Sequence, residues 1–141
     1  MNKLTPYLMF NGNCKEALEF YTDCFKGEIL FMGKFIDSPM EVSKEDEDKI
    51  MHADFSFWGG KLFASDHINM AGFTSFSTES NIHMSLSFDQ LDEMKSTFES
   101  LSHEGTITMP INETFWGDTF GMLTDKFGIK WMMSFREEKP A

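Results

Sequence analysis

The sequence predicts an α+β fold built from two copies of one module, each with a strand, a helix and then three strands. Two observations indicate the modules: an amphipathic helical pattern occurs twice, and runs with the alternation of strands surround each helix. The third is an internal repeat, which pairs Phe10 with Phe88, Phe20 with Phe98, Gly27 with Gly105 and Ile29 with Ile107, each 78 positions apart. We expect the eight strands to form a curved, mostly antiparallel sheet with both helices on its outer face and a concave inner face.

The first module is predicted over residues 1–66. A helix is expected over residues 14–25, because its apolar side chains recur at the three- and four-residue spacing of one face. The turn at residues 11–13 should cap this helix, and Gly27 marks its end. Strands are expected at residues 4–10, 28–35, 50–58 and 61–66, the last two joined across Gly59 and Gly60.

Two segments do not fit the strand or helix patterns. Residues 36–49 contain a charged run from Lys44 to Lys49, which predicts a solvated loop. This loop accounts for ten extra residues in the first module, because the hairpin glycines Gly60 and Gly128 are only 68 positions apart. Residues 67–80 are rich in Gly, Ser, Thr and Asn and predict a linker or a lid.

The second module is predicted over residues 81–141, packed with the first into one compact domain. Asp89 and Asp92 resemble a capping box that starts a helix, and Gly105 ends it. Strands are expected at 82–88 and 106–111. A final hairpin lies within residues 113–131, with a type I turn from Asp125 closed by a left-handed Gly128.

Strand alternation predicts which side chains face away from the helices. In residues 83–88, Met84, Leu86 and Phe88 should pack under the helix, which turns His83, Ser85 and Ser87 to the inner face. In residues 51–57 the apolar alternation likewise turns His52, Asp54 and Ser56 to that face. The inner face is thus expected to be either simply solvated or the wall of a ligand cavity.

Composition excludes several classes of partner. A net charge of -11 opposes binding to nucleic acid or to anionic membrane surfaces, because both are polyanionic. No segment approaches the length of apolar chain needed to span a bilayer, so a cytoplasmic protein is expected. Cys14 and Cys24 lie ten positions apart on the predicted helix, too far for a disulfide. Twelve Met and sixteen Phe predict either a soft aromatic core or an adaptable apolar cavity.

Motifs spread over nearly the whole chain resemble the PhnB-like branch of the vicinal-oxygen-chelate superfamily, which includes glyoxalase I, extradiol dioxygenases and the bleomycin- and fosfomycin-resistance proteins. The motifs are Pro6-Tyr7-Leu8, Asn11-Gly12, Glu16-Ala17, Phe20-Tyr21, Phe25, Met51-His52-Ala53, Ser65-Asp66, Pro110, Phe115-Trp116-Gly117, Phe120-Gly121, Asp125, Phe127-Gly128 and Trp131. The resemblance implies paired βαβββ modules, and a homodimer with pockets between modules or subunits.

The resemblance also implies where metal-dependent members would bind a divalent ion. The corresponding positions are Thr5 or Pro6, Ala64, His83 and Met132, and of these only His83 is a common ligand. We therefore expect no metal and no other cofactor; if a metal is bound, His83 and Asp66 are the expected ligands, with His52 or His67 as a further donor.

The candidate pocket-lining residues are His83, Ser85, Asp66, His52, Trp116, Phe120 and Met132. His83 is either a general base or hydrogen-bonding group, or a structural histidine. Trp116 and Phe120 form either an aromatic wall or part of the core. Asp66 is expected to cap the hairpin or to orient a histidine.

Whether the protein is an enzyme is not decided by its sequence, and a dimeric interaction module without a ligand is one open function. Two further open functions involve a small molecule. The first is a metal-independent small-molecule binding protein of the glyoxalase and bleomycin-resistance type. The alternative is a metal-assisted lyase, isomerase or dioxygenase. A third label given to such proteins, demethylubiquinone methyltransferase, requires an S-adenosylmethionine site, and the chain has no glycine-rich strand-to-helix turn of the dinucleotide type.

Overall fold

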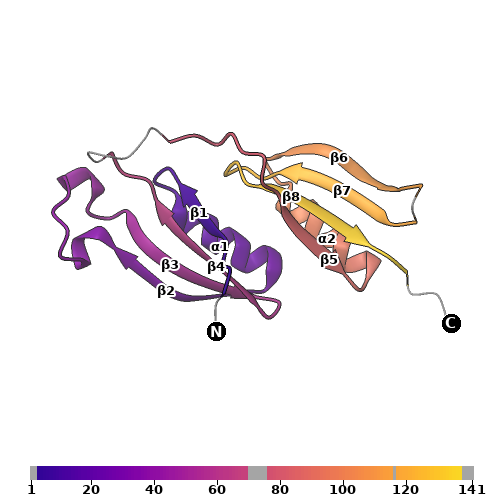
Figure 1. Ribbon diagram of the computed structural model, residues 1–141, viewed down its shortest axis with the longest axis horizontal. Helices are drawn as coiled ribbons and strands as arrows, with labels where there is room; N and C mark the ends of the chain where they lie inside the picture. Colours follow the sequence, from indigo (N-terminus) through magenta and orange to yellow (C-terminus); the bar gives the residue numbers. More distant parts are fainter. Residues whose placement is uncertain (1–2, 70–75, 116, 138–141) are drawn as a thin grey trace. The chain divides into compact units, whose positions relative to one another are not determined.

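The computed structural model describes residues 3–69, 76–115 and 117–137. The chain divides into two compact units, Met1–Ser77 and Thr78–Ala141. Each unit holds one four-stranded sheet and one α-helix (Figure 1). The expected content of two modules is therefore confirmed, with the eight strands divided between two sheets.

The first unit contains one strand, a helix and three further strands, with two short 3-10 helices in the loop before the third strand. The strand order is β1-β4-β3-β2, in which β1 runs parallel to β4 and the other pairs are antiparallel. The elements are β1 (Tyr7–Phe10), α1 (Cys14–Phe25), β2 (Glu28–Lys34), η1 (Phe35–Asp37), η2 (Lys44–Asp46), β3 (Ile50–Phe57) and β4 (Gly60–Asp66).

The second unit repeats this topology without the two short helices among its described residues. Its strand order is β5-β8-β7-β6, with β5 parallel to β8. The elements are β5 (Met84–Phe88), α2 (Leu91–Leu101), β6 (Thr106–Glu113), β7 (Thr119–Thr124) and β8 (Lys130–Phe135).

The repeated glycines mark equivalent close contacts in the two units. A Cβ atom on Gly27 would lie 2.8 Å from the carbonyl oxygen of Ser56, and one on Gly105 would meet the carbonyl oxygen of Thr124. Ser56 and Thr124 are themselves 68 positions apart, the offset of the two hairpins. Because any side chain would push the strand away, glycine is required at both turns from helix to strand.

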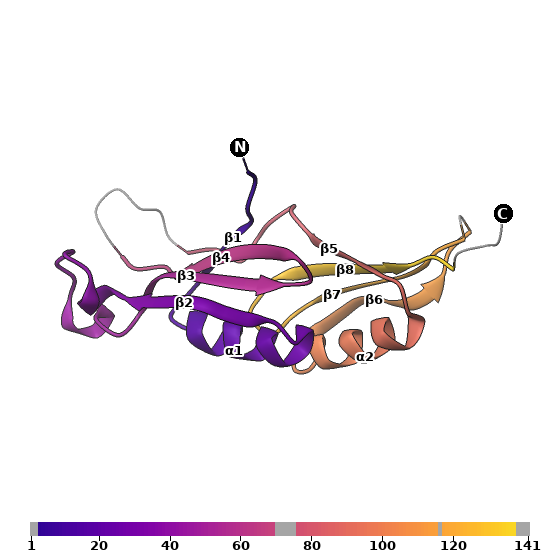
Figure 2. The ribbon, with the colours of Figure 1, turned by 90° about the horizontal axis from the view of Figure 1, so that it is seen from below.

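Each helix covers one face of its own sheet (Figure 2). In the first unit the alternate residues Leu8 and Phe10 of β1 are buried, and in the second Leu86 and Phe88 of β5 are buried. Ser85 and Ser87 between them are exposed, so the predicted alternation of β5 is confirmed. The core of each unit lies between its helix and its sheet.

Several local expectations are wrong. Residues 4–6 are not part of a strand, and Leu4 is 99% exposed. Asp89 and Asp92 do not form a capping box: Gln90 is the N-cap of α2, with no side-chain hydrogen bond to the helix. The charged run is not wholly solvated, since Asp46 is buried, bonded to Lys49 at 2.7 Å and to Ser43 at 2.9 Å.

None of the described helices combines the length and the apolar character needed to span a lipid bilayer.

The terminal hairpin is organised by the buried carboxylate of Asp125, which is only 3% exposed. Its Oδ1 accepts hydrogen bonds from the turn amides of Phe127 (2.9 Å) and Ile129 (3.1 Å), and its Oδ2 accepts one from the indole Nε1 of Trp131 (2.8 Å). Gly128 closes the turn in the left-handed region, at φ +91°, as expected. The carboxylate thus fixes the turn to the largest core side chain of the second unit.

Replacement of this carboxylate should destabilise the protein strongly. Asp125→Ala leaves the buried indole N–H and two turn amides without their acceptor, so we expect a loss of about 3 kcal/mol in the free energy of unfolding. Urea denaturation measures it. Asp48→Ala is the control, because Asp48 forms only a surface ion pair with Lys34 and should cause no clear change. Equal effects of the two substitutions would contradict this role of Asp125.

Candidate functional site

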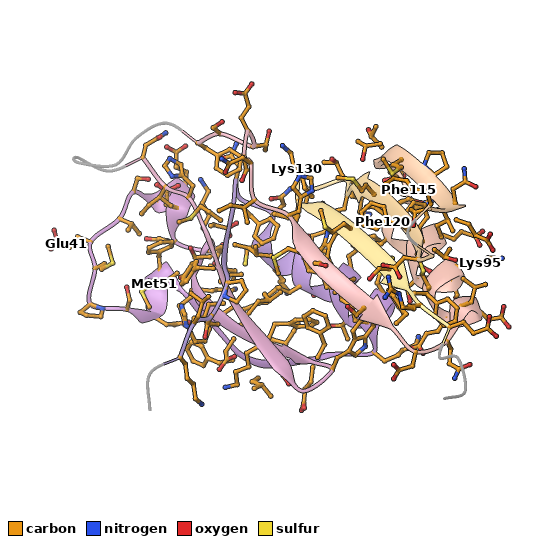
Figure 3. The ribbon with its side chains drawn as sticks, turned by 45° about the vertical axis from the view of Figure 1, so that its right-hand side comes forward. Glu41, Met51, Lys95, Phe115, Phe120 and Lys130 are labelled. Carbon is orange, nitrogen blue, oxygen red and sulfur yellow. The ribbon has the colours of Figure 1, made fainter. Side chains whose placement is uncertain are left out.

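A cavity of about 270 Å³ lies in the first unit. Most of its wall is apolar, and three of the apolar side chains are methionines. Its lining comprises Tyr7, Met9, Phe35, Met40, Met51, Ser65, Asp66, His67 and Ile68. Figure 3 labels Met51, which lies near the start of β3, and Glu41, which follows Met40 in the loop between β2 and β3.

Strand pairing and the loop bring the walls together. In the parallel β1–β4 pair, Tyr7 lies opposite Phe63 and Met9 opposite Ser65, so these side chains share one face of the sheet. The ladder continues past β4, because the backbone N–H of His67 donates to the carbonyl oxygen of Phe10 at 2.6 Å. Alternation therefore places His67 on the same face as Ser65. The connection between β2 and β3, residues 35–49, adds Phe35 and Met40 to the wall.

Asp66 has a structural function at the base of this cavity. Its Oδ1 accepts a hydrogen bond from the backbone N–H of Cys14, at the start of α1, and its Oδ2 accepts one from Ile50, at the start of β3; both are 2.8 Å. Because each oxygen is already bonded to a buried amide, the carboxylate orders the backbone. It was expected to cap the hairpin or orient a histidine; instead it bonds these two backbone amides.

Most polar groups of the cavity have partners, and one does not. The Ser65 hydroxyl donates to the sulfur of Met9 at 3.2 Å, and the Tyr7 hydroxyl is hydrogen-bonded to Nδ1 of His52 at 3.0 Å. The Nε2 atom of His67 is buried and has no hydrogen-bond partner among the residues that the structure describes. The His67 ring packs against Phe76, with the ring centroids 6.0 Å apart.

His52 lies behind Tyr7 rather than in the cavity wall. Its ring is surrounded by aromatic rings, with centroid distances of 5.1 Å to Phe63, 5.6 Å to Tyr7 and 6.4 Å to Phe31. Tyr7 therefore connects His52 to the cavity. Tyr7 and Met9 were missed because residues 7–10 are all apolar or aromatic, so alternation there gave no contrast between the two faces.

The other candidate residues lie in the second unit. Ser85 is exposed and lies opposite Met132 of β8. Phe120 lies opposite Ser134 of the same strand. These side chains share the sheet face that points away from the buried Trp131 and Met133. His83 directly precedes β5, and its Nδ1 is buried without a partner in the described part of the unit. Trp116 lies outside the described residues.

The donor groups do not fit a metal centre. Across the described ranges, no three or more His, Cys, Asp or Glu side chains form a group that could hold a metal ion. Ala64 and Met132, at two of the positions that the resemblance implies, offer no imidazole, carboxylate or thiolate. Asp66 is occupied by backbone amides.

The comparisons with known proteins agree with this fold. A family model described as 3-demethylubiquinone-9 3-methyltransferase matches residues 2–134. The chain belongs to this family. Protein YjdN of Escherichia coli (strain K12) is 32% identical over 147 residues, and the match covers 97% of each chain.

Solved structures agree with the expected resemblance: the chain is similar to a PhnB protein, and it shares the fold of a glyoxylase/bleomycin resistance protein/dioxygenase domain. Protein PA1353 of Pseudomonas aeruginosa superposes with a TM-score of 0.86 at 36% identity, over 98% of this chain and all of its own. The PhnB protein of Bacillus cereus gives 0.77 at 28% identity, over 95% and 99%. A glyoxylase/bleomycin resistance protein/dioxygenase domain from Frankia sp. EAN1pec, 14% identical, shares the fold with a TM-score of 0.66, over 99% and 96%.

The buried carboxylate beside Cys14 generates a prediction on thiol chemistry. Burial, and secondly the charge of Asp66, raise the pKa of the Cys14 thiol to about 12 from 9.0. At pH 8 the reactive thiolate should therefore be about 1000-fold rarer than for an ordinary cysteine. In a Cys24→Ser variant, a disulfide reagent such as 5,5′-dithiobis(2-nitrobenzoic acid) should label Cys14 only after unfolding in guanidinium chloride. Rapid labelling of the native variant at pH 8 would contradict the burial.

Proposed function

We propose that this protein binds a small, largely apolar molecule in the cavity of its first unit, without a metal ion. The supporting observation is the cavity itself, about 270 Å³ and lined by Met9, Met40, Met51 and Phe35. Thioether side chains are flexible and polarisable, so such a wall adapts to different apolar shapes. Small-molecule sites are usually lined by many apolar side chains and a few polar groups, as this cavity is.

The size of the cavity limits the ligand. An apolar cavity of about 150 Å³ holds one benzene molecule, so by proportion this cavity has room for about eleven non-hydrogen atoms. The enclosed part of the ligand is therefore a single or fused ring, or a short branched chain. A nucleotide cofactor would extend out of the cavity.

The family description names a methyl transfer, and we do not extend that reaction to this chain. The two strand-to-helix turns are residues 11–13 and 89–90, which contain one glycine between them. The glycine-rich turn that cradles a dinucleotide needs several glycines at fixed spacing. Binding of the apolar molecule is the function that the cavity supports best.

Filling the cavity should abolish binding. A thermal-shift screen of small apolar compounds should find ligands that raise the Tm of the protein, and Met9→Trp should remove those shifts because indole occupies the space. Met109→Trp is the matched control: Met109 lies on β6 of the other unit and is 45% exposed, against 44% for Met9. The proposal fails if no compound raises the Tm, or if Met9→Trp retains every shift.

The alternative function is that of a metal-assisted lyase, isomerase or dioxygenase. Such an enzyme would require a bound metal ion, whereas the proposed binding protein would not. We propose that the protein, purified without chelators, contains much less than one transition-metal ion per chain, because the described residues offer no set of three suitable ligands. Elemental analysis before and after incubation with Zn²⁺, Mn²⁺, Fe²⁺ or Ni²⁺ measures this. One tightly bound ion per chain in either sample would favour the enzyme.

A further inference from the structure

Aromatic rings and thioethers form most of the cavity wall. Six of the nine described lining residues carry one of these groups: the rings are those of Tyr7, Phe35 and His67, and the thioethers are those of Met9, Met40 and Met51. The buried apolar core of the same unit differs, because no methionine belongs to it among the described residues. Three of the four methionines that the structure describes in this unit line the cavity instead.

Several of these side chains remain half exposed to solvent. Tyr7 is 47% exposed, Met9 44% and Met40 39%. The Tyr7 ring packs against His52 and Phe63, with centroid distances of 5.6 Å and 6.1 Å, and these two rings still leave it half exposed. Removal of such apolar surface from water is favourable. A ligand in the cavity would therefore gain by covering an aromatic ring and thioether groups.

The chemistry of the wall distinguishes two kinds of ligand ring. Two aromatic rings attract each other when the positive edge of one meets the negative face of the other, and the polarisable sulfur of methionine also makes favourable contacts with an aromatic ring. A saturated ring gains only dispersion and burial from the same wall. Transfer from water alone favours the saturated ring, because it has more apolar surface. A preference for the aromatic ring would therefore come from the wall itself.

We infer that the ligand contains an aromatic ring, and that Tyr7 and the thioethers of the cavity select this ring over a saturated ring of the same size. The inference rests on the proposed function, because it assumes that the same cavity binds the ligand. It narrows the ligand from apolar molecules in general to aromatic compounds. It also gives the methionines of the wall a role in specificity, in addition to the flexibility of their side chains.

Two probes with the same skeleton test the inference. 2-Phenylethanol and 2-cyclohexylethanol are both neutral and carry the same hydroxyl group, and they differ only in the ring. Titration of each probe, followed by the ¹³C-labelled methyl group of Met9, gives the two dissociation constants. We expect the wild-type protein to bind 2-phenylethanol about threefold or more tightly than 2-cyclohexylethanol.

A double substitution tests the contribution of the thioethers. Met40→Leu with Met51→Leu removes two sulfur atoms, nearly conserves the volume of the wall and leaves Met9 as the reporter. We expect the preference for 2-phenylethanol to fall about threefold, while 2-cyclohexylethanol binds as before. Met109→Leu with Met122→Leu, in the second unit, is the matched control, because each pair combines one exposed and one half-buried methionine. The control should leave both dissociation constants unchanged.

Substitutions of Tyr7 separate its ring from its hydroxyl group. Tyr7→Leu should lower the preference for 2-phenylethanol, because it removes the aromatic ring from the wall. Tyr7→Phe keeps the ring and loses only the hydrogen bond between the hydroxyl and Nδ1 of His52, so the preference should remain. The same titrations measure both variants.

The outcomes separate this inference from the proposed function. Equal binding of both probes to the wild-type protein, or tighter binding of 2-cyclohexylethanol, overturns the inference and leaves the cavity as a binding site. A preference that is unchanged both in the double Leu variant and in Tyr7→Leu also overturns it. If neither probe binds, the inference fails; if in addition no compound of the screen raises the Tm, the proposed function fails as well. The wild-type comparison stands even if a variant does not fold.

Discussion

The first unit depends on one buried carboxylate that joins three elements. Asp66, at the end of β4, accepts hydrogen bonds from the first residue of α1 and the first residue of β3. The N-cap residue Asn13 makes no side-chain cap bond, so Asp66 takes over that role from 52 residues away. A negative charge at a helix N-terminus is stabilised by the aligned peptide dipoles as well as by the hydrogen bond. The carboxylate can be buried only because both oxygens are bonded. With Asp66 fixed, Ser65 and His67 on either side of it are held in the cavity wall.

The second unit has the same topology but a different buried acid. The position 68 residues beyond Asp66 is Ser134, on β8. The buried acid of that unit is Asp125, which lies before β8 and bonds to Trp131 and to two turn amides. The two units therefore share their strand order and their close-contact glycines, while the polar groups that fix each sheet differ. Backbone packing requires the shared features, whereas a buried carboxylate can be placed wherever unpaired amides converge.

The parts of the fold that could be predicted are those with local causes. The bounds of α1 follow from the spacing of its apolar residues and from the glycine after it, and β5 follows from its alternation. Long-range partners could not be predicted: nothing near Asp66 in sequence indicates that it caps α1, and a local capping motif at Asp89 and Asp92 proved wrong. The Met- and Phe-rich composition left a soft core and a cavity both open, and of the candidate pocket residues Asp66 is the one that lines this cavity. Met9, Met40 and Met51 follow no shared period, so only the fold brings them together.

The difference between the two repeats explains where the cavity lies. The terminal hairpin carries the most specific family motifs, yet in the structure Trp131 and Asp125 of this hairpin are buried in the second unit. The ten extra residues of the first unit fall between β2 and β3, and that longer connection contains both Phe35 and Met40. Two walls of the cavity therefore come from the segment that breaks the internal repeat. Connections at the end of a sheet tolerate insertions better than the strands that they join. The residues that identify the family are thus those that the fold needs, whereas the cavity is lined largely by residues of β1, β4 and the added loop.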